Sequence, residues 1–219
     1  MDLLSHSFDM LMAPLEASSL RRRREALIGR AAGRVLEVGA GTGANLSHYR
    51  EANLEEVTVS DVELRPAVLT RGADVGIAHH GDDGNHGTNG TRAMLRFRRT
   101  AVENLPFPDA YFDTVVSTLV FCSVTDPYEG LRQVRRVLKP GGKFLFIEHI
   151  LPEHGPAQPL FNAVTPVWKH LAGGCHLNRR TVRFIRESGF LIEEMRYFAN
   201  GAFVEGIAEK PVDVEPVLL

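Results

Sequence analysis

The sequence contains little cysteine and no long apolar run. Its two cysteines, Cys122 and Cys175, do not form a Cys-x-x-Cys pair, so neither a disulfide framework nor a zinc site is expected. No run of about 18 or more apolar residues occurs, which argues against an integral membrane segment. The segment before Leu20 lacks the basic start and uninterrupted apolar stretch of a secretory signal. We therefore expect a soluble cytoplasmic protein with reduced thiols.

Neither sign of charge is in large excess. The chain of 219 residues has 25 Lys and Arg against 27 Asp and Glu, a formal net charge of −2. With this balance the protein has no overall positive electrostatic potential that would attract nucleic acid or an anionic membrane. We therefore expect no nucleic-acid partner. The basic run Arg21–Arg24 is interpreted as the solvated face of a helix. The length fits one domain, and the oligomeric state is left open.

Apolar, β-rich runs alternate with plausible helices along most of the chain. This alternation predicts an α/β fold with a mostly parallel sheet. The expected strands cover residues 34–38, 57–60, 94–97, 112–116, 143–147, 190–195 and 203–208. The expected helices cover residues 7–31 with a break at Pro14, 44–49, 128–138, 160–172 and 180–188.

One segment has almost no apolar content. Residues 81–90 are Gly-Asp-Asp-Gly-Asn-His-Gly-Thr-Asn-Gly, and they predict a flexible surface insertion with outer bounds at 72–93. The nearby histidines His79, His80 and His86 raise the alternative of a metal site. A polar loop offers no rigid element to fix ligand geometry, so we predict no metal.

The strongest local motif is Glu-Val-Gly-Ala-Gly-Thr-Gly over residues 37–43, which follows a strand and precedes a helix. Its glycines allow a sharp turn and let a ligand lie against the main chain. Glu37 suits a cationic ligand such as S-adenosylmethionine (SAM), because a carboxylate at that point would repel a pyrophosphate. Asp61 ends the next strand, where a carboxylate can accept hydrogen bonds from ribose hydroxyls.

Other interpretations of this loop stay open. The spacing from Gly39 to Ala44 also satisfies the dinucleotide fingerprint, which would make the chain an NAD-linked oxidoreductase. Such enzymes often carry a catalytic Tyr-x-x-x-Lys, and neither Tyr111 nor Tyr128 has a lysine at that offset. A tight turn without a ligand is the remaining possibility.

Three motifs in sequence order resemble class I SAM-dependent methyltransferases. They are Val-Leu-Glu-Val-Gly-Ala-Gly-Thr-Gly at 35–43, Glu-Asn-Leu-Pro-Phe-Pro-Asp at 103–109, and Val-Leu-Lys-Pro-Gly-Gly at 137–142. The resemblance is to the type 11 branch, which includes the quinone-biosynthesis C-methyltransferases. It implies a Rossmann-like, seven-stranded, mostly parallel sheet whose last strand is antiparallel, with helices on both faces and an N-terminal helical lid. The implied divisions are a lid at 1–31, a catalytic domain at 32–210 and a tail at 211–219.

The resemblance also assigns cofactor contacts. It implies that the glycine loop holds the methionine part of SAM, that Asp61 binds the ribose and that Val62 flanks the adenine. Ala101 stands where the family carries an aspartate, so backbone groups and apolar contacts there would hold the adenine. Side chains after the fourth expected strand would lie beneath the transferred methyl group. The full set is Glu37, Gly39, Ala40, Gly41, Gly43, Asp61, Val62, Ala101, Val102, Glu103, Ser117, Leu119 and Val120.

Three further stretches resemble mammalian methyltransferase-like proteins that methylate alkyl thiols. They are residues 118–124, Glu148-His-Ile at 148–150, and Gly-Cys-His-Leu-Asn-Arg-Arg-Thr at 174–181. The resemblance implies a small, lipophilic acceptor, possibly a thiol. A quinone carbon, a phospholipid amine and a non-catalytic SAM-fold binding module remain as alternatives.

Two histidines are the candidate catalytic residues. His149 follows the fifth expected strand at the carboxyl edge of the sheet, where ligands bind in open α/β folds. His176 lies in the last of the thiol-type stretches. Tyr49 is a further possible base, whereas His170 is expected to pack in an apolar helix and Cys122 to be a buried apolar residue.

The resemblance also implies that the apolar N-terminal segment forms a lid. Residues 8–20 are rich in Phe, Met and Leu but belong to no strand–helix unit. Folded over the carboxyl edge towards Phe161 and Trp168, this lid would close an apolar pocket that excludes water. Completion of the core is the alternative role for these side chains.

Overall fold

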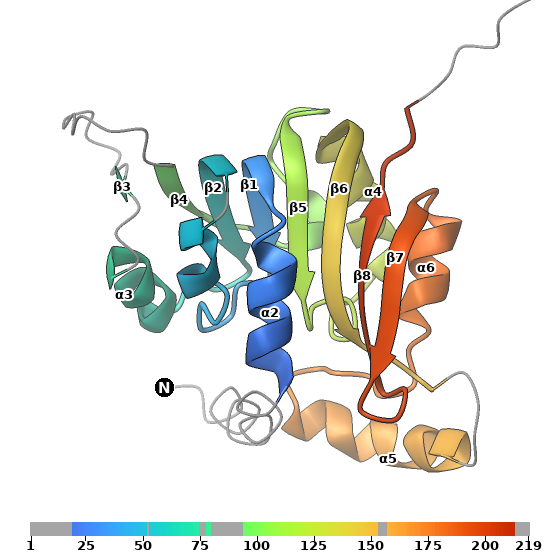
Figure 1. Ribbon diagram of the computed structural model, residues 1–219. Coiled ribbons are helices and arrows are strands. Elements are labelled where there is room, and N and C mark those ends of the chain that lie inside the picture. The colour runs from blue at the N-terminus through green and yellow to red at the C-terminus, as the bar shows by residue number, and fades with distance from the viewer. Residues whose placement is uncertain (1–18, 52, 75–77, 80–93, 153–156, 213–219) are drawn as a thin grey trace, which may run out of the picture.

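A computed structural model describes residues 19–51, 53–74, 78–79, 94–152 and 157–212. One twisted sheet forms the centre, with strand order β3-β4-β2-β1-β5-β6-β8-β7 (Figure 1). Strand β8 runs antiparallel to both neighbours, and the other pairs are parallel. The strands are β1 (Ala32–Val38), β2 (Asn53–Asp61), β3 (Ala78–His79), β4 (Met94–Arg99), β5 (Phe112–Thr118), β6 (Leu138–His149), β7 (Leu191–Phe198) and β8 (Phe203–Glu209).

Helices cover both faces of the sheet, as expected. Helices α4 and α6 lie on one face and α2 on the other, while α5 lies across the edge at which the parallel strands end (Figure 1). The helices are α2 (Arg21–Ile28), α3 (Pro66–Asp74), α4 (Pro127–Val137), α5 (Ala157–Leu171) and α6 (Thr181–Glu187), with 3-10 turns η2 (Leu46–Glu51) and η3 (Val102–Asn104). The Rossmann-like fold is therefore confirmed, and all seven expected strands are present. The two-residue β3 adds an eighth at one edge.

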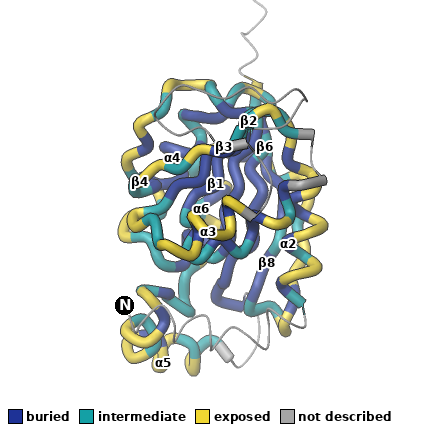
Figure 2. The backbone as a smooth tube through the Cα atoms, turned by 90° about the vertical axis from the view of Figure 1, so that its left-hand side faces the viewer, coloured by how far each residue is buried: buried dark blue, intermediate teal, exposed yellow. Residues whose placement is uncertain are grey.

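Side chains along the central strands point alternately to the two faces of the sheet and form a hydrophobic core on each face. In β1, Val35 joins the cluster under α2 and Leu36 joins the cluster under α4 and α6. Parallel strands covered on both faces are apolar on both faces, which explains their continuous Val, Leu and Phe runs. Figure 2 shows the resulting buried strands between more exposed helices.

Local signals explain why α4 begins where it does. The Asp126 side chain accepts a 3.0 Å hydrogen bond from the Glu129 backbone N–H, and Pro127 occupies the first turn. The apolar side chains Leu131 and Val134 are fully buried along one face of the helix.

Several elements differ from the sequence predictions. Helix α3 was not predicted, and it continues through residues 72–74 of the expected 72–93 insertion. Gly72 of this helix packs closely on Phe97: a Cβ there would lie 2.5 Å from Cζ of Phe97, so a larger residue would require the Phe97 ring to shift. The expected helix at 44–49 is instead the 3-10 turn η2. His80 and His86 lie outside the described residues.

The described part of the N-terminal region packs as core. Leu20 and Ile28 are fully buried beside the sheet, because α2 lies on a sheet face and not over the carboxyl edge. Residues 1–18, on which the lid prediction depends, lie outside the described residues. Within the described ranges, no helix has the length and apolar character needed to cross a membrane.

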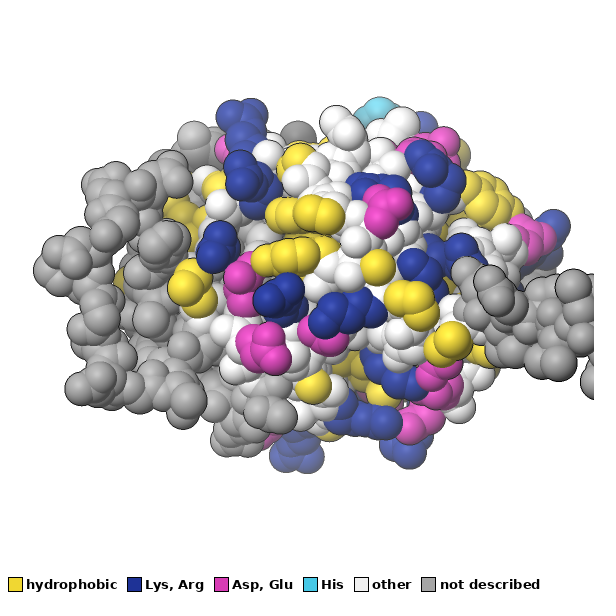
Figure 3. All heavy atoms as spheres, turned by 90° about the horizontal axis from the view of Figure 1, so that it is seen from above, with side chains coloured by type: hydrophobic (Ala, Val, Ile, Leu, Met, Phe, Trp, Pro, Cys, Tyr) yellow, Lys and Arg dark blue, Asp and Glu magenta, His cyan; other side chains and the backbone are white. Residues whose placement is uncertain are grey.

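The amino edge of the sheet carries mixed charge. Figure 3 views the molecule from this end, opposite α5, and shows Lys and Arg side chains interspersed with Asp and Glu. This visible face therefore offers no patch of a single sign, in line with the small net charge.

Candidate cofactor and acceptor site

The three loop glycines have different roles. All have positive φ, at +65° for Gly39, +55° for Gly41 and +80° for Gly43. A Cβ on Gly39 would lie 2.4 Å from Cγ2 of Val120, so this glycine lets the loop pack on the segment after β5. A Cβ on Gly41 would meet nothing within 4 Å. Gly41 therefore presents bare backbone to open space, as a ligand cradle requires.

Asp61 holds this loop. Its Oδ2 accepts a 2.7 Å hydrogen bond from the Gly41 N–H, and its Oδ1 accepts a 3.0 Å bond from the Glu63 N–H. A carboxylate has about four lone-pair sites, so further acceptor capacity remains. The next residue, Val62, leaves 62% of its surface exposed, an apolar patch directly beside the carboxylate.

Glu37 is buried with one oxygen unsatisfied. Its Oε1 accepts a 3.1 Å hydrogen bond from Nδ2 of Asn45, while Oε2 and the adjacent Tyr49 hydroxyl lack a well-formed hydrogen bond among the described residues. Burial raises the pKa of Glu37 to about 7, against the opposing influence of Tyr49, Asn45 and Arg24. A buried carboxylate whose second oxygen lacks a well-formed hydrogen bond is favourably completed by a cation, so the site fits the positive end of SAM.

Arg24 corrects the interpretation of the basic run. It is 6% exposed, and its Nη1 donates to Oδ1 of Asn45 at 2.7 Å and to Oγ1 of Thr118 at 2.6 Å. Helix α2 thereby ties the turn after β1 to the end of β5. The sequence contained a signal for this burial, because Arg24 shares the helix face of Leu20 and Leu27.

His149 lies on the same sheet face as Glu37 and Thr118. Its ring stacks on Phe161 of α5 with centroids 5.9 Å apart and meets the edge of Phe203 at 4.9 Å. Burial lowers its pKa to about 4, so the imidazole is neutral near pH 7. Its Nδ1 is buried without a hydrogen-bond partner in the described part of the chain.

Glu148, one residue earlier, faces the opposite side of the sheet. Its carboxylate accepts hydrogen bonds from Oγ of Ser117 at 2.8 Å and from the N–H groups of Val120 and Cys122 at 3.2 Å. Burial raises its pKa to about 7. Ser117 is thus fully buried beneath the loop after β5 and supports it. The sequence showed Glu148 only within a motif, without this positioning role.

The remaining predicted cofactor residues border the same edge. Thr100, just before Ala101, donates its N–H to the Asp61 carbonyl at 2.8 Å. Val102 is buried, while the Glu103 side chain accepts a hydrogen bond from the N–H of Thr125 at 3.0 Å. Leu119 has φ +61°, a strained value for a residue with a side chain.

The two remaining histidines fall in different places. His176 is in a loop that packs on the segment after β5, where its N–H donates to the Cys122 carbonyl at 2.8 Å. The structure thereby brings His176 to the carboxyl edge. His170 is exposed on α5, so the expectation that it packs in the protein interior was wrong.

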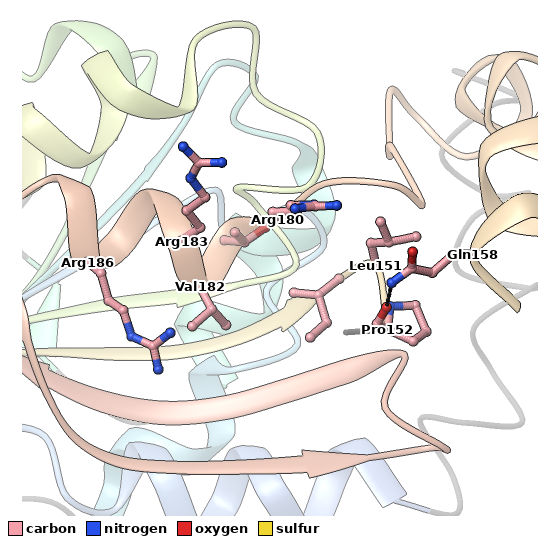
Figure 4. Close-up of a pocket in the computed structure, with 9 residues that line it drawn as sticks. Leu151, Pro152, Gln158, Arg180, Val182, Arg183 and Arg186 are labelled. Carbon is pink, nitrogen blue, oxygen red and sulfur yellow. Dashed lines mark hydrogen bonds between the residues drawn. The ribbon is translucent and has the colours of Figure 1, made fainter. Parts of the chain in front are cut away.

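A cavity of about 350 Å³ flanks this region between the end of β6 and the start of α6 (Figure 4). Leu151 and Val182 give it apolar walls, and Arg180 and Arg186 extend from its rim (Figure 4). No glycine-loop residue lines it, so this cavity is separate from the cradle at Gly41.

Comparison with known proteins decides the class. A family model described as a methyltransferase domain matches residues 36–146, which include the glycine loop, Asp61 and β6 as far as Phe146. The chain belongs to the SAM-dependent methyltransferase family. Its cofactor is SAM, as expected, and the NAD-linked alternative is set aside.

Relatives and a solved structure agree with this membership. The thiol S-methyltransferase TMT1B of Rattus norvegicus is 35% identical over 164 residues, covering 71% of this chain and 59% of that protein. The ubiquinone/menaquinone biosynthesis C-methyltransferase UbiE of Proteus mirabilis is 30% identical, covering 68% and 52%. An S-adenosylmethionine dependent methyltransferase from Mesorhizobium loti has the same fold, with TM-score 0.62 at 20% identity over 86% of this chain and 96% of that one. The chain thus spans less than two thirds of the rat and Proteus proteins.

Proposed function

We propose that this methyltransferase transfers the SAM methyl group to a small lipophilic acceptor, and that the acceptor is a thiol. The observation that carries methyl transfer is the bare backbone at Gly41 together with the buried carboxylate of Glu37 near the end of β1. The thiol class is supported by the relatives named as thiol S-methyltransferases. When bound, SAM would supply a methyl group on a sulfonium: a lone pair of the acceptor would bond to the methyl carbon, and the C–S bond would break to release S-adenosylhomocysteine.

The chain's own residues bind and orient the reactants. Glu37 and Tyr49 hold the cationic end of the cofactor, and Asp61 accepts hydrogen bonds from the ribose while fixing Gly41. Val62 and the backbone at Ala101 flank the adenine. Orientation of this kind can supply up to roughly 7–11 kcal/mol of the acceleration.

His149 receives the acceptor's proton or hydrogen bond at Nδ1. Because its pKa is lowered to about 4, it is a neutral ring and a weak base. A weak base is sufficient for a thiol, which ionises far more readily than a hydroxyl and reacts as its thiolate. Phe161 and Phe203 on the ring keep water from it.

The test is methyl-labelled SAM offered with a hydrophobic alkyl thiol, a demethylated quinol or phosphatidylethanolamine vesicles. We expect label in the thiol, and none with the Gly41→Val variant. Label in the quinol alone would favour the second candidate, C-methylation as in UbiE relatives. SAM binding without transfer to any acceptor would make the chain a binding module.

A further inference from the structure

The fold brings the two cysteines of the sequence together. Cys122 follows β5 and Cys175 follows α5, yet both lie in one cluster with Ala172, packed against Trp168 and Leu177. Cys122 is fully buried and Cys175 is 3% exposed. The cofactor cradle uses neither thiol, so their contact calls for a separate explanation.

Backbone geometry fixes the two residues side by side. The amide N–H of His176 is bonded covalently to the carbonyl carbon of Cys175, and it donates a 2.8 Å hydrogen bond to the carbonyl of Cys122. A disulfide needs Cα atoms about 4.4–6.8 Å apart, and a hydrogen bond between adjoining peptide groups brings the two backbones close together. The two thiols are also near enough to shift each other's pKa. The pair is therefore placed for closure.

The surroundings shift the pKa values of the two thiols in opposite directions. The hydrogen bond from Cys122 lowers the pKa of the Cys175 thiol, and Trp168 and Arg179 act in the same direction. The same hydrogen bond and complete burial raise the pKa of the Cys122 thiol. Cys175 is thus the thiol of the pair that ionises more readily, and Cys122 is the one that holds its proton more firmly.

We propose that Cys122 and Cys175 form an oxidisable dithiol, which hydrogen peroxide converts to an intramolecular disulfide that slows methyl transfer. The Cys175 thiolate attacks one peroxide oxygen, the O–O bond breaks, and a sulfenic acid forms as hydroxide leaves. The Cys122 sulfur then attacks the Cys175 sulfur, the S–S bond forms, and the hydroxyl departs with a proton as water. The thiols lose two electrons, and peroxide is reduced to two waters.

The disulfide acts on the loop that Glu148 holds. An S–S bond of about 2.05 Å pulls Cys122 towards Cys175, whereas its N–H is bonded to Glu148 and the neighbouring Phe121 carbonyl accepts from Arg179. The same loop begins at the strained Leu119. Distortion here moves the floor of the acceptor site, and this effect on turnover rests on the proposed function.

The experiment treats the full chain with hydrogen peroxide and then with dithiothreitol. Free thiols are titrated in denaturant, the intact mass is recorded, and thiol methylation is assayed at each stage. We expect two free thiols to become none, with a monomeric mass lower by two hydrogens, slower methylation, and recovery of both on reduction. Because the sequence has only two cysteines, this mass change identifies the bond. Cys122→Ala and Cys175→Ala are matched controls that cannot form it within one chain.

Other results overturn the proposal. A disulfide-linked dimer, added oxygen on one cysteine, or two thiols still free after peroxide would show that the pair does not close. A disulfide without loss of turnover would refute the switch. If the reduced chain methylates no acceptor, the proposed function is wrong. The thiol titration still shows independently whether the disulfide forms.

Discussion

The backbone N–H of Gly41 donates a 2.7 Å hydrogen bond to Oδ2 of Asp61. This bond joins the ends of β1 and β2 at the carboxyl edge. A single carboxylate therefore sets the loop conformation and remains able to accept hydrogen bonds from a ribose. The two roles can be separated by comparing cofactor affinity with protein stability.

Replacing Asp61 with alanine should weaken SAM binding by about 1.5–3 kcal/mol, the range for hydrogen bonds to a charged group. Titration calorimetry measures the loss. Glu63→Ala is the control, because the Glu63 side chain is exposed and only its backbone N–H contacts Asp61. Equal SAM affinity in the wild type and Asp61→Ala would mean that Asp61 does not bind the cofactor.

Gly41→Val should abolish detectable SAM binding and leave the protein folded. The added side chain meets no protein atom within 4 Å at Cβ, so it projects into the cofactor space. The positive φ of +55° costs about 1–2 kcal/mol of stability. Gly173→Val is a matched control, since Gly173 has φ +57° and equally open space. Similar loss of SAM binding in both variants would contradict the cradle.

SAM affinity should depend on the ionisation of Glu37. With its pKa raised to about 7, the carboxyl is increasingly protonated below neutral pH and must release its proton to hold a cation. Affinity should therefore rise as pH increases through about 7, with proton release visible by calorimetry in buffers of different ionisation enthalpy. The Glu37→Gln variant should bind weakly and lack this part of the pH dependence. Identical proton release in both proteins would exclude Glu37.

The contribution of Glu148 to the stability of the cofactor-free protein should fall as pH rises towards 7. The pKa of buried Glu148 is about 7 against an ordinary 4.5, so between these values the folded state binds more protons than the unfolded state. Its contribution is thus most favourable at the acidic end of this window and is lost as pH passes about 7. Denaturant midpoints across the range measure the slope, which Glu148→Gln should reduce. That variant should also lose about 1–3 kcal/mol below pH 7 through its mismatched hydrogen bonds. An unchanged slope would be the contrary result.

His149→Gln should lower kcat/KM for a thiol acceptor about 10-fold to 100-fold. This loss lies at or below the rate factor that a general acid or base usually contributes, because a thiol ionises readily without help. SAM affinity should stay the same, since His149 contacts the aromatic rings of Phe161 and Phe203. His170→Gln, at an exposed position on α5, is the control. A parallel loss of SAM affinity would show that His149 is part of the cofactor site.

Local pattern explains why the fold was largely predictable. The strand ending at Val38 is followed at once by glycines, and the strand ending at Asp61 by a polar segment, so both ends were visible in a short window of sequence. The sequence did not predict helix α3, because glycine is an unfavourable helix residue and the packing of Gly72 against Phe97 is visible only in the structure.

The sequence by itself determined the order of the seven expected strands, the glycine loop and the acid that follows it, because each depends on residues close together in the chain. Only the tertiary structure decided which groups the buried Arg24 contacts, since its partner Thr118 is 94 residues away. The same holds for Glu148 over Ser117 and for Cys122 beside Cys175. Such contacts arise where β5 lies between β1 and β6 and where α5 crosses the carboxyl edge, and this spatial order is set by packing of the whole sheet.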